Sequence, residues 1–230
     1  MIDINNTLDL IKLKFYNEWL YVAHIYEEGE SEFHKQLTQK VIAEYVDPLN
    51  LPKDSVIMDL GCGVGYFLDF MKEKGYTNLT GVTLTPNDVK ICKEKGHNIK
   101  QYDMSFLPQK DGWWDESVDF IFLRHALEHS PYPIFSLMEY NRVLKQGGKM
   151  YIEMPAPELT RKHELNPNHY SVLGITQLSA LLDRTGFKID IFNSLEFDLT
   201  VEIQEDGTKL EEREKYFCIV VTKTRPLDIK

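Results

Sequence analysis

An acidic side chain followed by alternating glycines ends an apolar run, in the segment DLGCGVG at residues 59–65. A short β-branched run that breaks into glycines is typical of a buried strand that turns sharply into a helix. Glycine lets the backbone turn tightly and lets a ligand approach where a Cβ would intrude. The next helix would direct its first N–H groups and its positive dipole end toward that turn. The pattern predicts a site for a small, partly anionic or nucleotide-like molecule.

Two common phosphate-binding motifs do not fit this turn. The dinucleotide fingerprint needs Gly-x-Gly-x-x-Gly, but its third position here is Tyr66, and glycine comes one residue early at Gly65. A P-loop needs Lys followed by Ser or Thr at the end of its turn, which this segment lacks. An NAD-type oxidoreductase is therefore the weaker alternative.

A second candidate for chemistry is HALEH at residues 125–129, which fits the His-x-x-Glu-His pattern of a zinc site on one helix. That site needs all five residues to be helical. A strand-like run precedes them, however, and SPYP follows at 130–133, where prolines disfavour helix. We therefore expect a strand exit, a short turn and no metal. His125 and His129 are candidates for a general base, and hydrogen bonding that shapes the turn is the favoured interpretation.

The elements that would position these residues alternate along the chain. Strand-like runs lie at 55–60, 79–84, 99–102, 118–123, 149–154, 187–192 and 216–222. Helices are predicted at 33–45, 65–74, 86–95, 133–145 and 176–185. This alternation predicts βαβ units and a parallel sheet covered on both faces. The last two strands have no helix between them and should pair antiparallel, with a charged, loop-rich connection over 202–214.

Composition limits the setting of the protein. The chain has 230 residues, a net charge of −10 and three widely separated cysteines, Cys62, Cys92 and Cys218. The charge disfavours non-specific binding to nucleic acid or anionic lipid, and the cysteines indicate a reducing compartment. The acidic N-terminus does not fit a signal peptide, and no run approaches the roughly 20 apolar residues of a membrane span. We expect a cytoplasmic protein with no nucleic-acid or membrane partner, and its oligomeric state is left open.

A series of ordered motifs resembles the class I S-adenosylmethionine (SAM)-dependent methyltransferases, of the small type-11 or type-23 kind. The motifs are IMDLGCGVG at 57–65, GVTLTP at 81–86, YDMSFLP at 102–108, DESVDFI at 115–121, RHALEH at 124–129 and RVLKQGG at 142–148. The resemblance implies a Rossmann-like α/β fold, doubly wound, with a mostly parallel seven-stranded sheet and one antiparallel strand near the C-terminus. It implies an enzyme that moves a methyl group from SAM to a small-molecule or lipid-like acceptor and leaves S-adenosylhomocysteine.

The resemblance also implies roles for particular residues. Glycines equivalent to Gly61, Gly63 and Gly65 lie against the methionine part of SAM, and Asp59 would lie beside its ammonium group. Asp103 and the Met104 backbone would bind the adenine. The remaining cofactor-binding candidates are Cys62, Thr83, Leu84, Asp88, Arg124 and His125. His125 would lie close to the methyl group.

The ribose contact departs from the family pattern. Many members have an acid at the end of the second strand, where this chain has Thr83, and threonine cannot form the bidentate, charge-assisted pair. The segment Thr83-Leu84-Thr85 is similar to the corresponding motif of the cyclopropane fatty acid synthase branch of the family. In that branch a residue three positions later helps to hold SAM, and that position here is Asp88. Asp88 either supplies the missing carboxylate or caps its helix with Thr85. Thr83 supports a further alternative, a SAM-binding protein without catalysis.

Acceptor contacts are expected outside these motifs. Candidates are Glu153, Glu158, Arg161, Lys162, His163, Glu164, Asn168, His169 and Tyr170. A solvated loop is the alternative interpretation of the charges among them. A predicted amphipathic helix at 7–28, ended by Gly29, could act as a lid through Tyr16, Trp19, Tyr21 and Tyr26, and packing is the favoured interpretation of Trp19. We expect a helical cap over 1–50 and a SAM-binding methyltransferase domain over 51–230, in a single unit.

Overall fold

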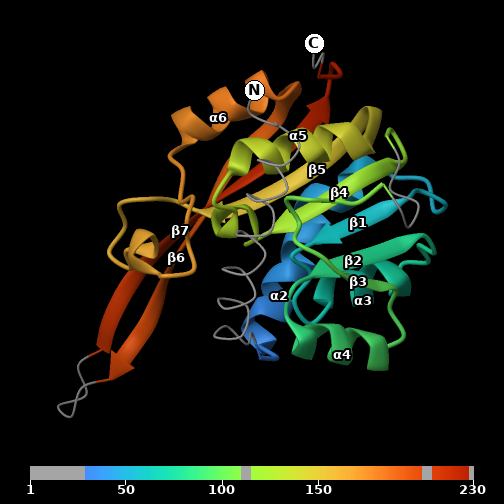
Figure 1. The fold of residues 1–230 in the computed structure, drawn as a ribbon. Coiled ribbons are helices and arrows are strands. Elements are labelled where there is room, and N and C mark those ends of the chain that lie inside the picture. The colour runs from blue at the N-terminus through green and yellow to red at the C-terminus, as the bar shows by residue number, and fades with distance from the viewer. Residues whose placement is uncertain (1–28, 110–114, 204–208, 228–230) are drawn as a thin grey trace, which may run out of the picture.

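Seven strands form one sheet with helices on both faces (Figure 1). The computed structural model describes residues 29–109, 115–203 and 209–227. The strands are β1 (Ile57–Leu60), β2 (Leu79–Thr83), β3 (Ile99–Gln101), β4 (Val118–Arg124), β5 (Leu144–Pro155), β6 (Phe187–Ile203) and β7 (Lys209–Lys223). The α-helices are α2 (Glu32–Val41), α3 (Tyr66–Glu73), α4 (Pro86–Glu94), α5 (Pro133–Val143) and α6 (Ile175–Arg184). The predicted helix at 7–28 lies outside the described residues.

The strand order is β3-β2-β1-β4-β5-β7-β6, which places a topological switch between β1 and β4. β1 pairs parallel with β2 and with β4, and its Ile57 is in register with Leu79 on one side and Phe120 on the other. β7 runs antiparallel to both β5 and β6. The expected doubly wound sheet with one antiparallel strand near the C-terminus is therefore confirmed.

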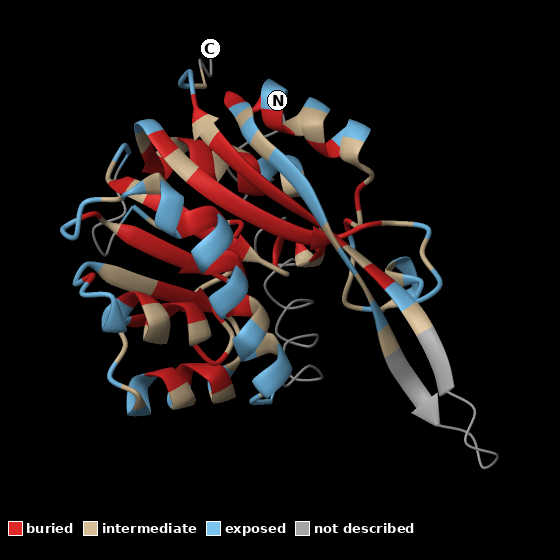
Figure 2. Ribbon diagram, turned by 180° about the vertical axis from the view of Figure 1, so that it is seen from behind, coloured by how far each residue is buried: buried red, intermediate tan, exposed pale blue. Residues whose placement is uncertain are grey.

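Neighbouring residues of each central strand face opposite layers of the core, because side chains alternate along a strand. Ile57 packs in one cluster with buried residues of α2, α3 and α4, while Met58 packs in a second cluster with α5 and α6. Figure 2 shows the central strands buried along most of their length. This two-sided burial explains why the strands appear in the sequence as continuous apolar runs rather than alternating ones.

The last two strands extend much further than the sequence predicts. β6 continues to Ile203 and β7 begins at Lys209, so the expectation of a loop over 202–214 is wrong for most of that segment. Figure 2 shows this hairpin reaching beyond the layered body. Glu196 on β6 lies 2.7 Å from Arg213 and 2.9 Å from Lys215 on β7. Cross-strand ion pairs let charged residues form a ribbon that hydrophobic patterning does not reveal.

The predicted helix at 33–45 is present in two parts. α2 ends at Val41, a wider π-type turn follows over Ile42–Val46, and a short 3₁₀ turn over Asp47–Leu49 completes the segment. The wider turn brings Ile42, Tyr45 and Val46 into the same core layer as α3. This packing fixes the position of α2 relative to the sheet, next to the site described below.

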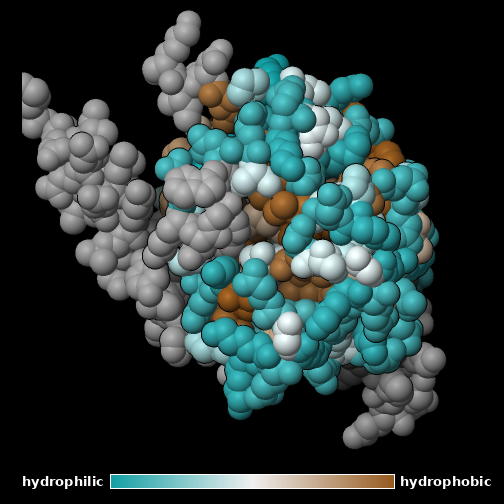
Figure 3. All heavy atoms as spheres, turned by 90° about the vertical axis from the view of Figure 1, so that its right-hand side faces the viewer, coloured by the Kyte–Doolittle hydropathy of each residue, from teal (hydrophilic) through white to brown (hydrophobic). Residues whose placement is uncertain are grey.

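Most of the face seen in Figure 3 is hydrophilic, with apolar side chains gathered near its middle and smaller apolar areas toward its edges. Among the described residues, no helix combines the length and the apolar character needed to cross a bilayer.

Candidate active site

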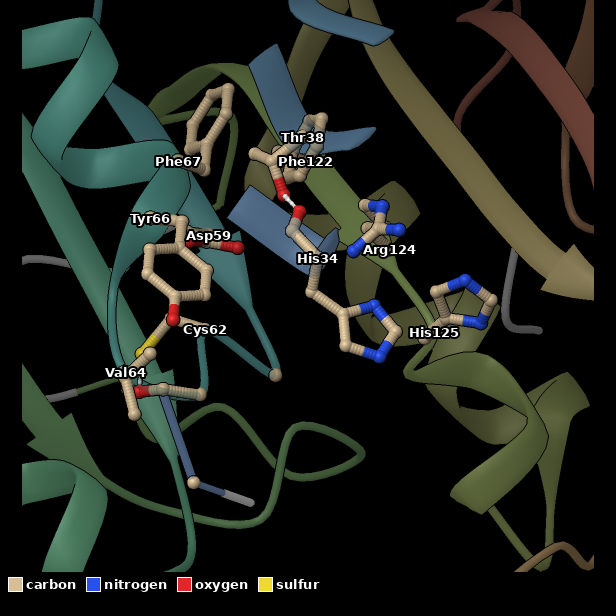
Figure 4. A pocket seen from close by; sticks show the side chains of 13 residues that line it. His34, Thr38, Asp59, Cys62, Val64, Tyr66, Phe67, Phe122, Arg124 and His125 are labelled. Atoms are coloured by element: carbon tan, nitrogen blue, oxygen red, sulfur yellow. Dashed lines mark hydrogen bonds between the residues drawn. The ribbon is translucent and has the colours of Figure 1, made fainter. Parts of the chain in front are cut away.

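A pocket lies at the carboxyl ends of β1 and β4, at the switch point where open α/β sheets bind ligands (Figure 4). Its empty volume is about 520 Å³ including its open mouth. The lining residues are Gly29, His34, Thr38, Asp59, Gly61, Cys62, Gly63, Val64, Tyr66, Phe67, Phe122, Arg124 and His125. The pocket thus brings together the glycine turn, Arg124 and His125, as the sequence predicts.

The glycine turn needs glycine for two separate reasons. Gly61 has a φ of +76°, and a Cβ at this position would lie 2.6 Å from the Cβ of Ala126, which follows β4. Gly65 has a φ of +85° and precedes the first residue of α3. The N–H groups of Gly61 and Cys62 both donate to the carbonyl of Val82, at 2.9 and 3.0 Å. The turn is therefore fixed against β2 and has no room for a side chain near Ala126.

Asp59 is the acid of the pocket. It is 3% exposed, and burial raises the pKa of its carboxyl to about 8 although Arg124 acts in the opposite direction. A buried carboxylate without a close cation is costly, so the proton stays on Asp59 near neutral pH. A cationic ligand group at this position would shift the balance toward the carboxylate.

Glu153 on β5 organises the opposite wall. It is fully buried, with its Oε1 2.9 Å from Arg124 Nε and 3.0 Å from His125 Nε2, and Tyr151 donates to its Oε2 at 2.6 Å. Burial alone would raise its pKa, but Arg124, His125 and Tyr151 outweigh it and hold the pKa at about 2. We predicted Glu153 as an acceptor contact, and its oxygens are occupied in holding these three side chains.

His125 is charged at neutral pH in this arrangement. Burial favours the neutral ring, but hydrogen bonds with Glu128 and Glu153 outweigh burial and raise the pKa to about 9. The residue has a φ of +48°, and only a 3₁₀ turn over Leu127–His129 follows. The segment is therefore not one α-helix, as the flanking prolines predict. An imidazolium is a poor proton acceptor, which weakens the interpretation of His125 as a general base.

His34 on α2 is the imidazole that sequence reasoning missed. Figure 4 shows its ring reaching toward Arg124 and His125, and its centroid is 6.3 Å from that of His125. Burial, with help from Arg124 and His125, lowers the pKa of His34 to about 4, so the ring is neutral. The Ser31 hydroxyl caps α2 by accepting from the His34 N–H, and the Ser31 backbone N–H donates to the Tyr66 hydroxyl at 2.6 Å. The available signal was His34 and Thr38 at a four-residue spacing, on one face of a helix.

The predicted acceptor residues after β5 form a network beside the pocket. Arg161 and His163 both bind the buried carboxylate of Glu214 on β7. His163 stacks on His169 with ring centroids 5.6 Å apart, and His129 donates from Nδ1 to the Asn168 carbonyl at 2.8 Å. The sequence did not single out Glu214, because this charged segment was expected to be a loop. None of these residues lines the pocket of Figure 4.

Other members of the predicted acceptor set lie at the surface or outside the described part of the chain. Tyr170 is exposed, and its backbone N–H donates to the Glu128 carbonyl. Glu158 and Lys162 have positive φ in the same connection, and the Glu158 N–H donates to Glu164. Tyr16 lies outside the described residues, as do Trp19, Tyr21 and Tyr26 of the predicted lid.

The predicted ribose and adenine residues lie at or just after the ends of β2 and β3, and none of them belongs to the lining of the pocket described above. Thr83 and Asp88 are buried, and the Thr85 side chain makes no capping hydrogen bond, which disfavours the capping-box interpretation of Asp88. Asp103 accepts from the Ser105 N–H at 2.7 Å, and burial raises the pKa of its carboxyl.

Met104 and Leu84 are the two remaining cofactor candidates of this group, and both contact other parts of the protein. The Met104 side chain packs in the core, which leaves only its backbone for a ligand. The carbonyl of Leu84 accepts from the Gln101 side chain at 2.9 Å.

A doubly wound sheet with an antiparallel β7 and a glycine turn at its switch point defines the class I methyltransferase type of fold. The family model described as a methyltransferase domain matches residues 32–190, so the chain belongs to this family of SAM-dependent methyltransferases. A methyltransferase from Bacillus halodurans has a TM-score of 0.67 at 16% identity, over 81% of this chain and 99% of that one. The expected fold, family and cofactor are confirmed, and the NAD-type oxidoreductase no longer stands.

The curated relatives act on different acceptors. A tRNA U34 carboxymethyltransferase of Aliarcobacter butzleri is 28% identical over 70% of this chain and 55% of its own length. A sterol 4-C-methyltransferase of Caenorhabditis elegans is 28% identical over 64% of this chain and 42% of its own length. The chain thus spans about half the length of these relatives.

The exclusion of nucleic acid as a partner is wrong. Several matched relatives are named as tRNA methyltransferases, including the Arabidopsis thaliana protein at 27% identity. The exclusion relied on a net charge of −10, which is an average over the whole chain. Recognition of single-stranded RNA uses stacking and hydrogen bonds to unpaired bases, and these do not require a basic protein overall.

Proposed function

We propose that this protein transfers the methyl group of SAM to an acceptor that lies on the His34 and His125 side of the pocket. The observation that carries the proposal is the pairing of two buried groups across one pocket. Asp59, with its raised pKa, stands beside the glycine turn, and Arg124 stands opposite. SAM carries an ammonium and a carboxylate on its methionine part, which match these two residues.

The residues fit that cofactor. Asp59 would bind the ammonium, and Arg124 offers Nη2, a buried atom without a hydrogen-bond partner among the described residues, to the carboxylate. Gly61 and Gly63 line the pocket without side chains, so their backbone could lie against the ligand. Asp103 and the Met104 backbone would bind the adenine, and Thr83 with Asp88 would bind the ribose. Bound SAM supplies a methyl group already activated by a sulfonium.

The protein then has to position the acceptor and exclude water. Alignment of reacting groups of this kind can lower a barrier by about 7–11 kcal/mol. His34 is suited to orient the acceptor, because its ring is neutral and its buried Nδ1 has no hydrogen-bond partner among the described residues. His125, held as an imidazolium by Glu128 and Glu153, would supply positive charge and a fixed wall.

We propose a small acceptor group, because α2 lines one side of the pocket and the β6–β7 hairpin packs against His125 on the other. The Tyr216 ring on β7 meets the His125 ring edge-to-face at 4.4 Å, and the Phe197 ring on β6 meets Tyr216 at 5.5 Å. Such a wall suits a planar or aliphatic group, whether it belongs to a free metabolite, a lipid or a nucleoside.

The three buried free cysteines support a cytoplasmic location.

The test is transfer of isotope-labelled methyl groups from SAM. The protein is incubated with a metabolite extract, a lipid extract and total tRNA, and each fraction is analysed by mass spectrometry. Label in one fraction identifies the acceptor class. SAM binding without label in any fraction would favour the non-catalytic alternative. His34→Ala should reduce transfer by about 10²-fold or more if His34 orients the acceptor, with SAM affinity measured in parallel.

A further inference from the structure

Three potential metal ligands converge behind His125, outside the pocket lining. They are Glu128 and His129, from the short turn after β4, and His169, from the connection after β5. One ligand atom from each side chain lies within 4.8 Å of the other two. The rings of His129 and His169 meet edge-to-face at 4.9 Å. Two segments 40 positions apart in the sequence therefore bring a carboxylate and two imidazoles together.

Backbone hydrogen bonds hold the two segments in place. The N–H groups of Tyr170 and Ser171 both donate to the Glu128 carbonyl, at 2.7 and 2.9 Å. His169 directly precedes this double contact, so its position relative to Glu128 is set by the backbone. The cluster is thus a product of tertiary structure rather than of two mobile side chains that happen to meet.

The orientation of His129 suits a metal ligand. Its Nδ1 donates to the Asn168 carbonyl at 2.8 Å, so in the neutral ring the lone pair is on Nε2. Metal-binding histidines almost always donate their second ring N–H to a carbonyl or carboxylate in this way, which fixes the tautomer. The bond also couples the His129 ring to the residue that precedes His169.

Two buried atoms of Glu128 and His169 have no hydrogen-bond partner among the described residues. Glu128 is 1% exposed, and its Oε2 has no hydrogen-bond partner among the described residues, while its Oε1 lies 3.4 Å from His125 Nδ1. Nδ1 of His169 is likewise buried and without a partner in the described chain, and its Nε2 lies 3.2 Å from the Asn166 side-chain nitrogen. Buried polar atoms are rarely left unpaired in native proteins, and a bound cation would satisfy the carboxylate oxygen.

We propose that Glu128, His129 and His169 bind one divalent transition-metal ion, with Zn²⁺ as the probe of choice. Two imidazole nitrogens and one carboxylate oxygen suit Zn²⁺, Fe²⁺ and related ions, and three protein ligands leave at least one coordination position open. The expected absence of a metal was based on the helical His-x-x-Glu-His geometry, which needs His125. This site uses His169 instead. Binding of the ion does not depend on the proposed methyl transfer.

The test uses the full chain after treatment with a chelator. Equilibrium dialysis against Zn²⁺ followed by metal analysis should give one ion per chain. His169→Ala should weaken binding at least tenfold, as loss of even an outer-shell partner of a metal costs about 10–100-fold. His97→Gln is the matched control and should bind within about twofold of the wild type, because its Nε2 pairs with Asp69 on α3 and not with the cluster. Thermal unfolding without metal checks that both variants fold.

A second measurement keeps the test decisive if His169→Ala unfolds. Co²⁺ bound by the wild type should give visible d–d absorption without a thiolate charge-transfer band, because no cysteine belongs to the cluster. Glu128→Gln should abolish that spectrum. Absence of stoichiometric Zn²⁺ binding by the wild type, equal binding by His169→Ala, equal loss in the His97→Gln control, or a thiolate band would each overturn the proposal.

Discussion

The protonation of Asp59 predicts a steep pH dependence of cofactor binding. With its pKa at about 8, the carboxyl is mostly protonated at pH 6 in the free protein. If the ammonium of the ligand binds the carboxylate, Asp59 must lose its proton on binding. Each pH unit below the pKa then costs about 1.4 kcal/mol, or tenfold in affinity. We expect the dissociation constant of S-adenosylhomocysteine to fall roughly 50-fold between pH 6 and 8, because Asp59 is about 1% ionised at pH 6 and about half ionised at pH 8.

The direction follows from proton linkage, since binding releases a proton below pH 8 and affinity therefore rises with pH. Above about pH 8 the ligand α-amino group begins to lose its own proton, so the rise should stop. The two histidines of the pocket have pKa values outside this window, about 4 for His34 and about 9 for His125. The slope is thus assigned to Asp59.

Isothermal titration calorimetry at several pH values measures the slope directly. Repeating it in buffers of different ionisation enthalpy counts the protons released, which should be close to one at pH 6. Asp59→Asn should bind more weakly at pH 8 and lose the slope. Asp183→Asn, at a position whose side chain is 80% exposed on α6, should keep it. Affinity that is flat from pH 6 to 8 in the wild type, or an unchanged slope in Asp59→Asn, would refute the reasoning.

Three further predictions concern the glycine turn, the buried ion cluster and the core. Gly61→Val should abolish binding of S-adenosylhomocysteine, because a Cβ there meets Ala126 at 2.6 Å and the φ is +76°, and calorimetry that shows unchanged affinity would contradict it. Glu153 has its pKa lowered from 4.5 to about 2, so its contribution, about 3 kcal/mol by linkage, is present above pH 4.5 and lost as the pH falls toward 2. Urea unfolding of wild type and Glu153→Gln at pH 7 and pH 3 checks this, and equal losses on acidification would argue against it. Asn141→Ala should cost about 2–3 kcal/mol by leaving two backbone carbonyls unpaired, and a smaller change in urea unfolding would show that water replaces the amide.

The layered body of the protein could be predicted because its signals are local. Continuous apolar strands such as 118–123 are typical of a sheet buried on both faces, and the structure has β4 there, from Val118 to Arg124. Pro86 and Pro133 begin α4 and α5, as their fixed φ favours the first helical position. The long hairpin was missed, because its strands carry charged residues that pair across the ribbon rather than an apolar face.

Pocket residues from distant segments could not be assigned in the same way. His34 and His125 are 91 positions apart, and only the packing of α2 against α3 brings the His34 ring to the end of β4. The protonation state of an imidazole likewise depends on residues that are distant in the sequence. Burial leaves His34 neutral, whereas two buried glutamates keep His125 protonated. The sequence alone treats both rings as ordinary histidines.

The sequence by itself determined the order of strands and helices, the glycine turn at 61–65 and, through its motifs, the family of SAM-dependent methyltransferases. These features depend on residues that are adjacent or regularly spaced, so the backbone conformation they need can be inferred from residue type. Only the tertiary structure decided which imidazole is neutral, which carboxyl is protonated and which side chains meet as possible metal ligands. Those properties depend on desolvation and on charges from distant segments, and both arise only when the chain has folded.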